Sequence, residues 1–129
     1  IIKNKLFPSN GDSSIWNKLL IDVETISYIS LPEDANKITE IIIYHCKKIN
    51  LNPKETIITD ATAGAGGNVF SFSKSFKLVN AIEQDVKRYQ YLTNNINVYQ
   101  IVNVNHYCDD CINLIYNIYH DIIFIDPPW

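Results

Sequence analysis

The fold of this chain is decided by residues 56–68, which read TIITDATAGAGGN. A short β-branched run leads directly into a glycine-rich turn, and residues 69–74 beyond the turn can form a helix. Glycine has no Cβ, so such a turn lets the backbone approach a ligand closely, and the start of the next helix offers free N–H groups. The order of strand, glycine turn and helix therefore predicts a site for a nucleotide-like ligand.

The rest of the chain continues to alternate strands with helices. Further strands are predicted over residues 77–83, 101–107 and 121–126, the last of them fully buried. Helices are predicted from Ser30, which heads an S-x-x-E capping box, from the capping residue Asp85, and over residues 111–119. Strands that alternate with helices imply a parallel sheet with right-handed crossovers, so the predicted fold class is α/β.

The composition describes one domain. The chain has 129 residues, of which 47% are hydrophobic and 19% charged, and its apolar runs are far shorter than the roughly 20 residues that cross a bilayer. The formal net charge of -3 excludes a broad basic face that wraps a nucleic-acid duplex. We expect a monomer without membrane contact, in which residues 1–30 form an N-terminal helical extension and residues 31–129 form the domain itself.

The cysteines and the chain ends bear on location and completeness. Cys46, Cys108 and Cys111 form an odd set with no signal peptide ahead of them, which is typical of an intracellular protein, cytoplasmic or nuclear. Cys108 and Cys111 have C-x-x-C spacing, but a zinc site needs four ligands, so we predict no metal site. The chain starts without Met and stops just after a predicted core strand. These ends indicate a fragment of a longer protein.

Acidic residues stand at the carboxyl ends of the predicted strands, along one edge of the sheet. Asp60 ends the first strand and could face a cationic group such as an amino-acid ammonium. Glu83 ends the second strand, where an acidic side chain can accept the hydroxyls of a ribose. Asp109 and Asp110 follow the third strand, and one of them could accept a hydrogen bond from the adenine amine. A surface carboxylate at Glu83 and a helix cap at Asp109 or Asp110 are the alternatives.

The last four residues, Asp126-Pro127-Pro128-Trp129, are the most specific element of the sequence. Successive prolines fix φ twice and remove two donors, which leaves stiff backbone carbonyls as acceptors. Asp126 and the carbonyl of Pro127 can together accept both N–H bonds of an exocyclic amine, while Trp129 offers a stacking face for a base. The alternative is a rigid loop with a core Trp.

Together these segments resemble the class I S-adenosylmethionine-dependent methyltransferases. Among these, the chain is most similar to the trimethylguanosine synthase family, the cap-specific guanine-N2 methyltransferases. The resemblance rests on the D-x-x-x-G-x-G-G-N turn at residues 60–68, the acidic Glu83 on the next strand, the Pro-Pro-Trp ending, and the upstream segment 28–32. It spans roughly residues 28–129.

The resemblance implies a Rossmann-like fold whose first four strands are present here and whose C-terminal strands are missing. S-adenosylmethionine would be the cofactor and the 7-methylguanosine cap of an RNA the partner, with Trp129 stacked on the cationic base. Residues 31–129 would form the cofactor-binding methyltransferase domain. The implied catalytic residues are Asp126, Pro127, Pro128 and Trp129. The implied cofactor-binding residues are Asp60, Ala61, Thr62, Gly64, Gly66, Asn68, Glu83 and Asp110.

Other functions stay open at this point. The family usually has Ser where this chain has Asp126, and Asp-Pro-Pro-Trp also occurs in adenine-N6 methyltransferases of RNA, usually with the motifs in permuted order. An adenine-N6 or other amino-methyltransferase and a non-catalytic binding module of the same fold are therefore alternatives. The glycine spacing disfavours a nicotinamide-binding fold, and Asn68 after Gly67 disfavours a Walker loop. Lys outnumbers Arg ten to one, which fits an AT-rich genome such as that of a large DNA virus.

Overall fold

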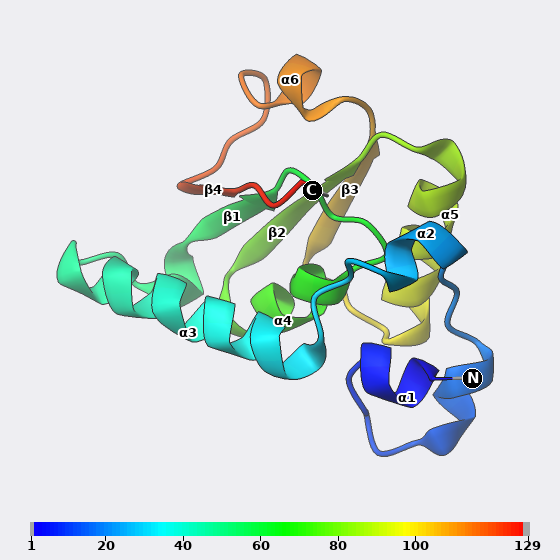
Figure 1. Cartoon of the computed structure of the whole chain (residues 1–129). Coiled ribbons are helices and arrows are strands. Elements are labelled where there is room, and N and C mark those ends of the chain that lie inside the picture. The colour runs from blue at the N-terminus through cyan, green and yellow to red at the C-terminus, as the bar shows by residue number, and fades with distance from the viewer. Residues whose placement is uncertain (1, 128–129) are drawn as a thin grey trace.

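Four parallel strands form the centre of the computed structural model, which describes residues 2–127 (Figure 1). They are β1 (Ile57–Asp60), β2 (Leu78–Glu83), β3 (Val104–Cys108) and β4 (Ile122–Phe124). Their order in the sheet is β3-β2-β1-β4, and every pairing is parallel. The predicted α/β class is confirmed. The chain adds β2 and β3 on one side of β1 and then crosses to add β4 on the other side, so the strand order reverses between β1 and β4. In open α/β sheets, ligands bind at the carboxyl ends of the strands at such a point.

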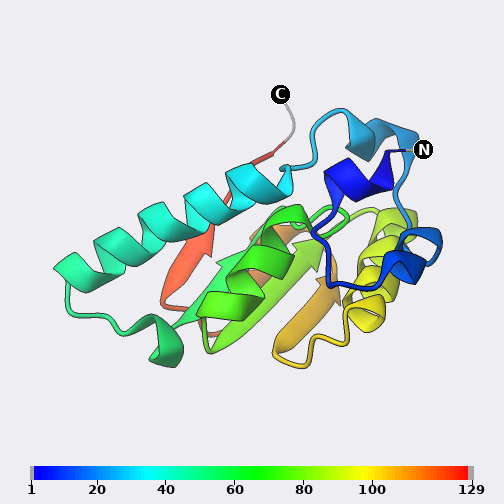
Figure 2. The same cartoon turned by 90° about the horizontal axis from the view of Figure 1, so that it is seen from below.

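Helices connect the strands and precede them. They are α1 (Lys3–Leu6), α2 (Val23–Ile26), α3 (Pro32–Lys48), α4 (Gly67–Ser75), α5 (Val86–Val98) and α6 (Cys111–Leu114), with short 3-10 turns at Ser13–Asn17 and Pro53–Glu55. Figure 2 shows α3 and α4 side by side on one face of the sheet. No helix within residues 2–127 is long and apolar enough to cross a membrane.

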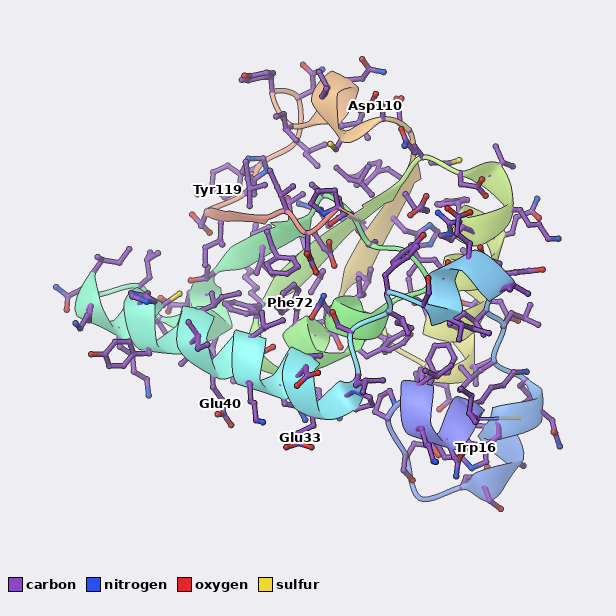
Figure 3. All side chains as sticks on the ribbon, in the orientation of Figure 1. Trp16, Glu33, Glu40, Phe72, Asp110 and Tyr119 are labelled. Carbon is purple, nitrogen blue, oxygen red and sulfur yellow. The ribbon has the colours of Figure 1, made fainter. Side chains whose placement is uncertain are left out.

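One core joins the sheet to α3, α4 and α5. In Figure 3 Phe72 of α4 lies between the helix and the sheet, while Glu33 and Glu40 of α3 point away from it. The buried members of this core are Cys46, Ile58, Ala63, Val69, Phe72, Phe76, Val79, Ala81, Leu92 and Ile96. The cap that the sequence predicts for α5 is confirmed, because Asp85 accepts a hydrogen bond of 2.8 Å from the backbone N–H of Arg88.

The N-terminal segment packs a smaller core of its own. Phe70 of α4 stands at its centre, with ring centroids 6.1 Å from Phe7 and 4.7 Å from Tyr99. Leu6, Ile15, Leu19 and Ala65 complete the buried cluster. Residues 2–30 are therefore attached to α4 and α5 by apolar contacts.

Two glycines, Gly66 and Gly67, allow the turn between β1 and α4 to be tight. Gly66 has a φ of +111°, a region that side chains disfavour, and a Cβ at this position would lie 2.4 Å from Cζ of Phe70. Gly67 begins α4, and a Cβ there would lie 2.9 Å from the carbonyl oxygen of Ser30. The two glycines thus allow the turn to pack against the helix and against the N-terminal segment.

The predicted capping box is wrong, although the helix begins where expected. Leu31 is the N-cap of α3 and Pro32 its first residue, and no side chain caps this end. The hydroxyl of Ser30 instead accepts a hydrogen bond of 2.9 Å from the side-chain amide of Asn68. A tertiary contact therefore replaces the local cap.

The other strand and helix boundaries differ from the predicted ones at places where the residues are less buried than the sequence pattern suggested. The third strand begins only at Val104, because Val102 is 96% exposed. The fourth strand is not fully buried: among residues 2–127 it pairs with β1 alone, Ile123 within it is 40% exposed, and Ile125 just after it is 59% exposed. The helix predicted over residues 111–119 stops at Leu114, since no residue of α6 is buried and packing supplies most of a short helix's stability.

Replacing Gly66 by Ala should destabilise the protein far more than Gly11→Ala. Both glycines have positive φ, but a Cβ at Gly11 meets nothing within 4 Å, whereas one at Gly66 meets the buried ring of Phe70. We expect the free energy of unfolding to fall by about 1 kcal/mol for Gly11→Ala and by about 3 kcal/mol for Gly66→Ala. Urea unfolding measures both, and equal losses would contradict the close contact.

Candidate active site

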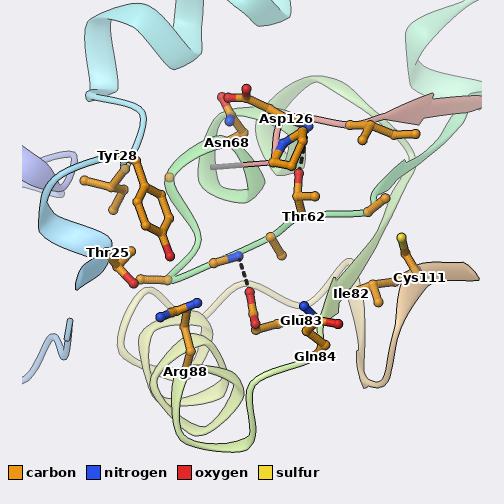
Figure 4. Close-up of a pocket in the computed structure, with 18 of the residues that line it drawn as sticks. Thr25, Tyr28, Thr62, Asn68, Ile82, Glu83, Gln84, Arg88, Cys111 and Asp126 are labelled. Atoms are coloured by element: carbon orange, nitrogen blue, oxygen red, sulfur yellow. Dashed lines mark hydrogen bonds between the residues drawn. The ribbon is translucent and has the colours of Figure 1, made fainter. Parts of the chain in front are cut away.

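A cavity of about 370 Å³ opens at the carboxyl ends of the strands (Figure 4). The turn after β1 and the end of β2 form its floor, and the residues that follow β4 form one rim. The start of α6 and the N-terminal segment close other sides. The cavity therefore lies at the point where the strand order reverses, as the topology indicates.

Most of the site residues that the sequence predicted line this cavity. They are Ala61, Thr62, Gly64, Asn68, Glu83, Asp110, Asp126 and Pro127. Asp60 and Gly66 do not line it: Asp60 is buried just behind the turn, and Gly66 faces Phe70. Pro128 and Trp129 lie outside the described residues.

Glu83 joins the end of β2 to the glycine turn. Its Oε1 accepts a hydrogen bond of 3.1 Å from the backbone N–H of Gly64, and its Oε2 accepts one of 2.8 Å from Asp85. A carboxylate has about four acceptor positions, so roughly two remain for a ligand. The side chain is 8% exposed and held in one orientation. Glu83 can therefore accept ligand hydroxyls without rearranging.

Asp60 is a buried carboxyl group with an incomplete set of partners. Oδ1 accepts a hydrogen bond of 3.0 Å from the backbone N–H of Thr62, but Oδ2 has no partner among the described residues. Burial, together with the charges of Asp126 and Glu83, raises the pKa of Asp60 to about 7 despite the bond from Thr62. A positive charge in the cavity would favour the ionised form of this group.

Asn68 presents a second buried acceptor at the start of α4. Its side-chain N–H donates to Ser30, while its Oδ1 has no partner within the part of the chain that is described. An unpaired buried acceptor costs roughly 1–3 kcal/mol, and native structures keep few of them without a functional reason. Because Asn68 lines the cavity, a ligand that donates a hydrogen bond would satisfy this oxygen.

The loop after β4 is hydrogen-bonded to the glycine turn. The backbone N–H of Asp126 donates to the hydroxyl of Thr62 at 2.9 Å, one of the dashed lines in Figure 4. This bond leaves the carboxylate of Asp126 exposed at the rim of the cavity. A ligand bound on the turn and a group bound by the loop would therefore be neighbours.

The acidic pair after β3 has a structural role as well. Asp110 is the N-cap of α6 and accepts a hydrogen bond of 3.0 Å from the backbone N–H of Ile112. Asp109 accepts bonds from Asp110 and Asn113. The helix-cap alternative is thus confirmed for Asp110, which also lines the cavity.

Sequence reasoning missed the wall that the N-terminal segment contributes. Thr25, Tyr28, Ile29 and Ser30 line the cavity, as does Arg88 of α5, the only Lys or Arg among the described lining residues. Arg88 donates to Asp22 at 2.9 and 3.2 Å. The resemblance pointed to segment 28–32, but no sequence signal pairs Arg88 with a residue 66 positions away.

Within residues 2–127 no group of three His, Cys, Asp or Glu side chains is arranged to hold a metal ion. Cys46, Cys108 and Cys111 are free thiols.

The sequence matches a known family and is similar to a viral protein. The sequence model of a family described as RNA cap guanine-N2 methyltransferase matches residues 55–129. An uncharacterized protein of Acanthamoeba polyphaga mimivirus is 40% identical over 147 aligned positions, which cover 99% of this chain and 57% of that protein. The chain therefore spans little more than half the length of this relative.

Solved methyltransferases share the fold. An rRNA methylase from Streptococcus thermophilus aligns with a TM-score of 0.51 and 22% identity, over 64% of this chain and 49% of that one. A protein-L-isoaspartate O-methyltransferase aligns with a TM-score of 0.59 and 18% identity, over 95% of this chain and 39% of that one. A putative methyltransferase from Streptococcus mutans in complex with SAH aligns with a TM-score of 0.53 and 21% identity, over 66% of this chain and 49% of that one. The architecture is thus the Rossmann-like fold of class I methyltransferases.

Replacing Asp60 by Asn should remove a pH dependence of stability. With a pKa of about 7 in the native state against 3.8 as the ordinary value, Asp60 holds a proton between these pH values that the unfolded chain has released. The wild-type protein therefore loses stability as pH rises toward 7, by about 3 kcal/mol between pH 5 and 8. Urea unfolding at both pH values should show this loss in wild type and not in Asp60→Asn.

Asp34→Asn makes the same chemical change on the exposed face of α3 and is the control. It should leave the pH dependence unchanged. If Asp60→Asn keeps the wild-type slope, the carboxyl group is not the buried, proton-binding group described here.

Proposed function

The chain belongs to the RNA cap guanine-N2 methyltransferase family, and on that premise we propose a reaction for the full-length protein. It transfers a methyl group from S-adenosylmethionine to the exocyclic N2 amine of a 7-methylguanosine RNA cap. The observation that carries this proposal is the hydrogen bond of 2.9 Å between Asp126 and Thr62. It ties the loop suited to an amine directly to the turn suited to the cofactor.

Unpaired acceptors in the cavity and just behind its turn suit S-adenosylmethionine. Oδ2 of Asp60 and Oδ1 of Asn68 are buried without partners in the described chain, and Glu83 has free acceptor positions. A ligand with ribose hydroxyls, an ammonium and a sulfonium would complement these oxygens. In this proposal Glu83 accepts the ribose hydroxyls, Asp110 accepts from the adenine amine, and Asn68 faces the methionine end, where the buried carboxyl group of Asp60 lies behind the turn.

When bound, S-adenosylmethionine supplies an electrophilic methyl group. The residues of this chain act on the amine that receives it. The carboxylate of Asp126 and the carbonyl of Pro127 accept its two N–H bonds, which draws the nitrogen toward tetrahedral geometry and frees a lone pair otherwise delocalised into the ring. Rate enhancement then comes mainly from positioning. The proton can leave after methyl transfer, so no strong general base is needed.

The cap is a suitable partner for a protein with a net charge of -3. A 7-methylguanine ring carries a delocalised positive charge, and an aromatic face attracts such a cation more strongly than a neutral base. We assign that face to Trp129. A few lysines are then enough for the phosphate bridge of the cap.

Methyl transfer by the full-length protein tests the proposal. With labelled S-adenosylmethionine, RNA that carries a 7-methylguanosine cap should gain N2-methylguanine, identified by mass spectrometry of its nucleosides. Asp126→Ala should lower kcat by about a hundredfold, because the amine loses one of its two positioning acceptors. Its affinity for S-adenosylhomocysteine should stay close to that of wild type. Asp34→Ala, an exposed change on α3, is the matched control.

Other outcomes identify the alternatives. Methylation of adenine, or equal use of caps with and without the 7-methyl group, would contradict the cap assignment and favour an adenine-N6 or general amino-methyltransferase. Cap binding without turnover would indicate a non-catalytic module. Absence of S-adenosylhomocysteine binding would overturn the enzyme proposal altogether.

A further inference from the structure

One wall of the cavity comes from a segment that precedes the sheet domain in sequence. Ile29 and Ser30 lie so close to Gly67 that a Cβ there would be 2.9 Å from atoms of both residues. Thr25 lies beside Gly64, with its methyl group 3.9 Å from the position of a Cβ. The segment therefore rests on the glycine turn itself and forms part of the cavity lining.

The segment that carries this wall runs from Leu20 to Ser30, and side-chain amides of two asparagines fix both of its ends. At its start, Asn95 of α5 accepts from the backbone N–H of Leu20 and donates to the carbonyl of Leu20, both at 2.8 Å. The same Asn95 amide donates to the carbonyl of Ala65 in the turn at 3.0 Å, and Asn95 is fully buried. At the end of the wall, Asn68 donates to Ser30.

Between these ends an ion pair holds the middle of the wall. Arg88 of α5 donates through Nε and Nη2 to the two carboxylate oxygens of Asp22, and Nη2 also reaches Glu24 at 3.3 Å. The Arg88 and Asp22 side chains are only 14% and 21% exposed. Asp22 also accepts a hydrogen bond from the hydroxyl of Thr25. The guanidinium is thus linked through one carboxylate to a residue that lines the cavity.

The short helix in this part of the chain contributes little stability of its own. The helix α2 has four residues and contains Val23, which is 86% exposed, and so short a helix is not stable without tertiary contacts. Although burial opposes ionisation of Asp22, the hydrogen bonds from Arg88 and Thr25 lower its pKa to about 2. The ion pair is therefore intact throughout the neutral pH range.

We propose that Arg88 is a positioning residue for cofactor binding, which acts through Asp22 to hold Thr25 and Tyr28 against the glycine turn. The Tyr28 ring also lies 5.8 Å from the guanidinium carbon of Arg88, and Figure 4 shows Arg88 beneath Tyr28 and Thr25. The inference rests on the proposed function, because it assumes that the cavity binds the cofactor. In this arrangement α5 sets the position of the wall.

A double-mutant cycle on the full-length protein separates this role from direct contact. Asp22→Asn and Arg88→Gln should each weaken binding of S-adenosylhomocysteine by about tenfold, measured by calorimetry at 15 °C. The double variant should be no weaker than Arg88→Gln alone, because both changes break one link. Arg88→Lys keeps the charge but not the two-point contact, and should restore part of the affinity.

The control is Lys37→Gln, which breaks the exposed Lys37–Glu33 pair of 3.1 Å on α3 and makes the same change in charge. It should bind S-adenosylhomocysteine as wild type does. Urea unfolding of every variant provides the second readout. A merely structural role would lower the free energy of unfolding and leave the dissociation constant unchanged.

Hydrogen exchange on the ligand-free protein tests the link independently of any ligand. Amides of residues 22–30 should exchange faster in Asp22→Asn and Arg88→Gln, while those of β1 and β2 should not. Normal binding by Asp22→Asn with weak binding by Arg88→Gln would overturn the proposal in favour of direct contact. Unchanged exchange in both variants would also overturn it. If the wild-type protein fails to bind S-adenosylhomocysteine, the proposed function fails, and this role falls with it.

Discussion

Three sides of the cavity contact the glycine turn between β1 and α4. Glu83 accepts from its Gly64 N–H, the loop after β4 donates to its Thr62 hydroxyl, and the N-terminal segment rests on Gly67. Asn95 adds a bond to the carbonyl of Ala65. A turn with side chains at the glycine positions could not be approached from so many directions. The geometry of the site thus follows from the absence of a few Cβ atoms.

The charge of the cavity follows from the arrangement of the strands in the sheet. Parallel strands end at one edge, and here Asp60 and Glu83 end neighbouring strands while Asp126 follows a third. The one cationic lining residue in the described chain, Arg88, is already paired with Asp22. The cavity is therefore rich in acceptors and suited to a ligand with positive charge and several donors. Burial and the charges of Asp126 and Glu83 raise the pKa of Asp60, so the ionised form of this group is unfavourable in the folded protein.

The sequence allowed the central turn and the acidic strand ends to be predicted, because both depend on local patterns. Residues 60–68 and Glu83 lie where the order of strand, turn, helix and strand puts them. Contacts between distant positions could not be predicted: Asn95 bonds Leu20 across 75 positions. Ser30 matched a capping box, but its hydroxyl is used by Asn68. The burial of the fourth strand was also overestimated, since an apolar run does not reveal that β4 pairs on one side only within this chain.

The central claim is that the cofactor binds on the glycine turn, under the wall held by α5. Backbone amide chemical shifts, recorded by NMR while S-adenosylhomocysteine is added to the full-length protein, test it most directly. The account predicts that the shifts concentrate at residues 61–68, at Glu83 and Asp110, and at residues 25–30, and that the distant end of α3 near Lys48 is unaffected. Shifts that omit residues 25–30, or that cluster away from the turn, would contradict it.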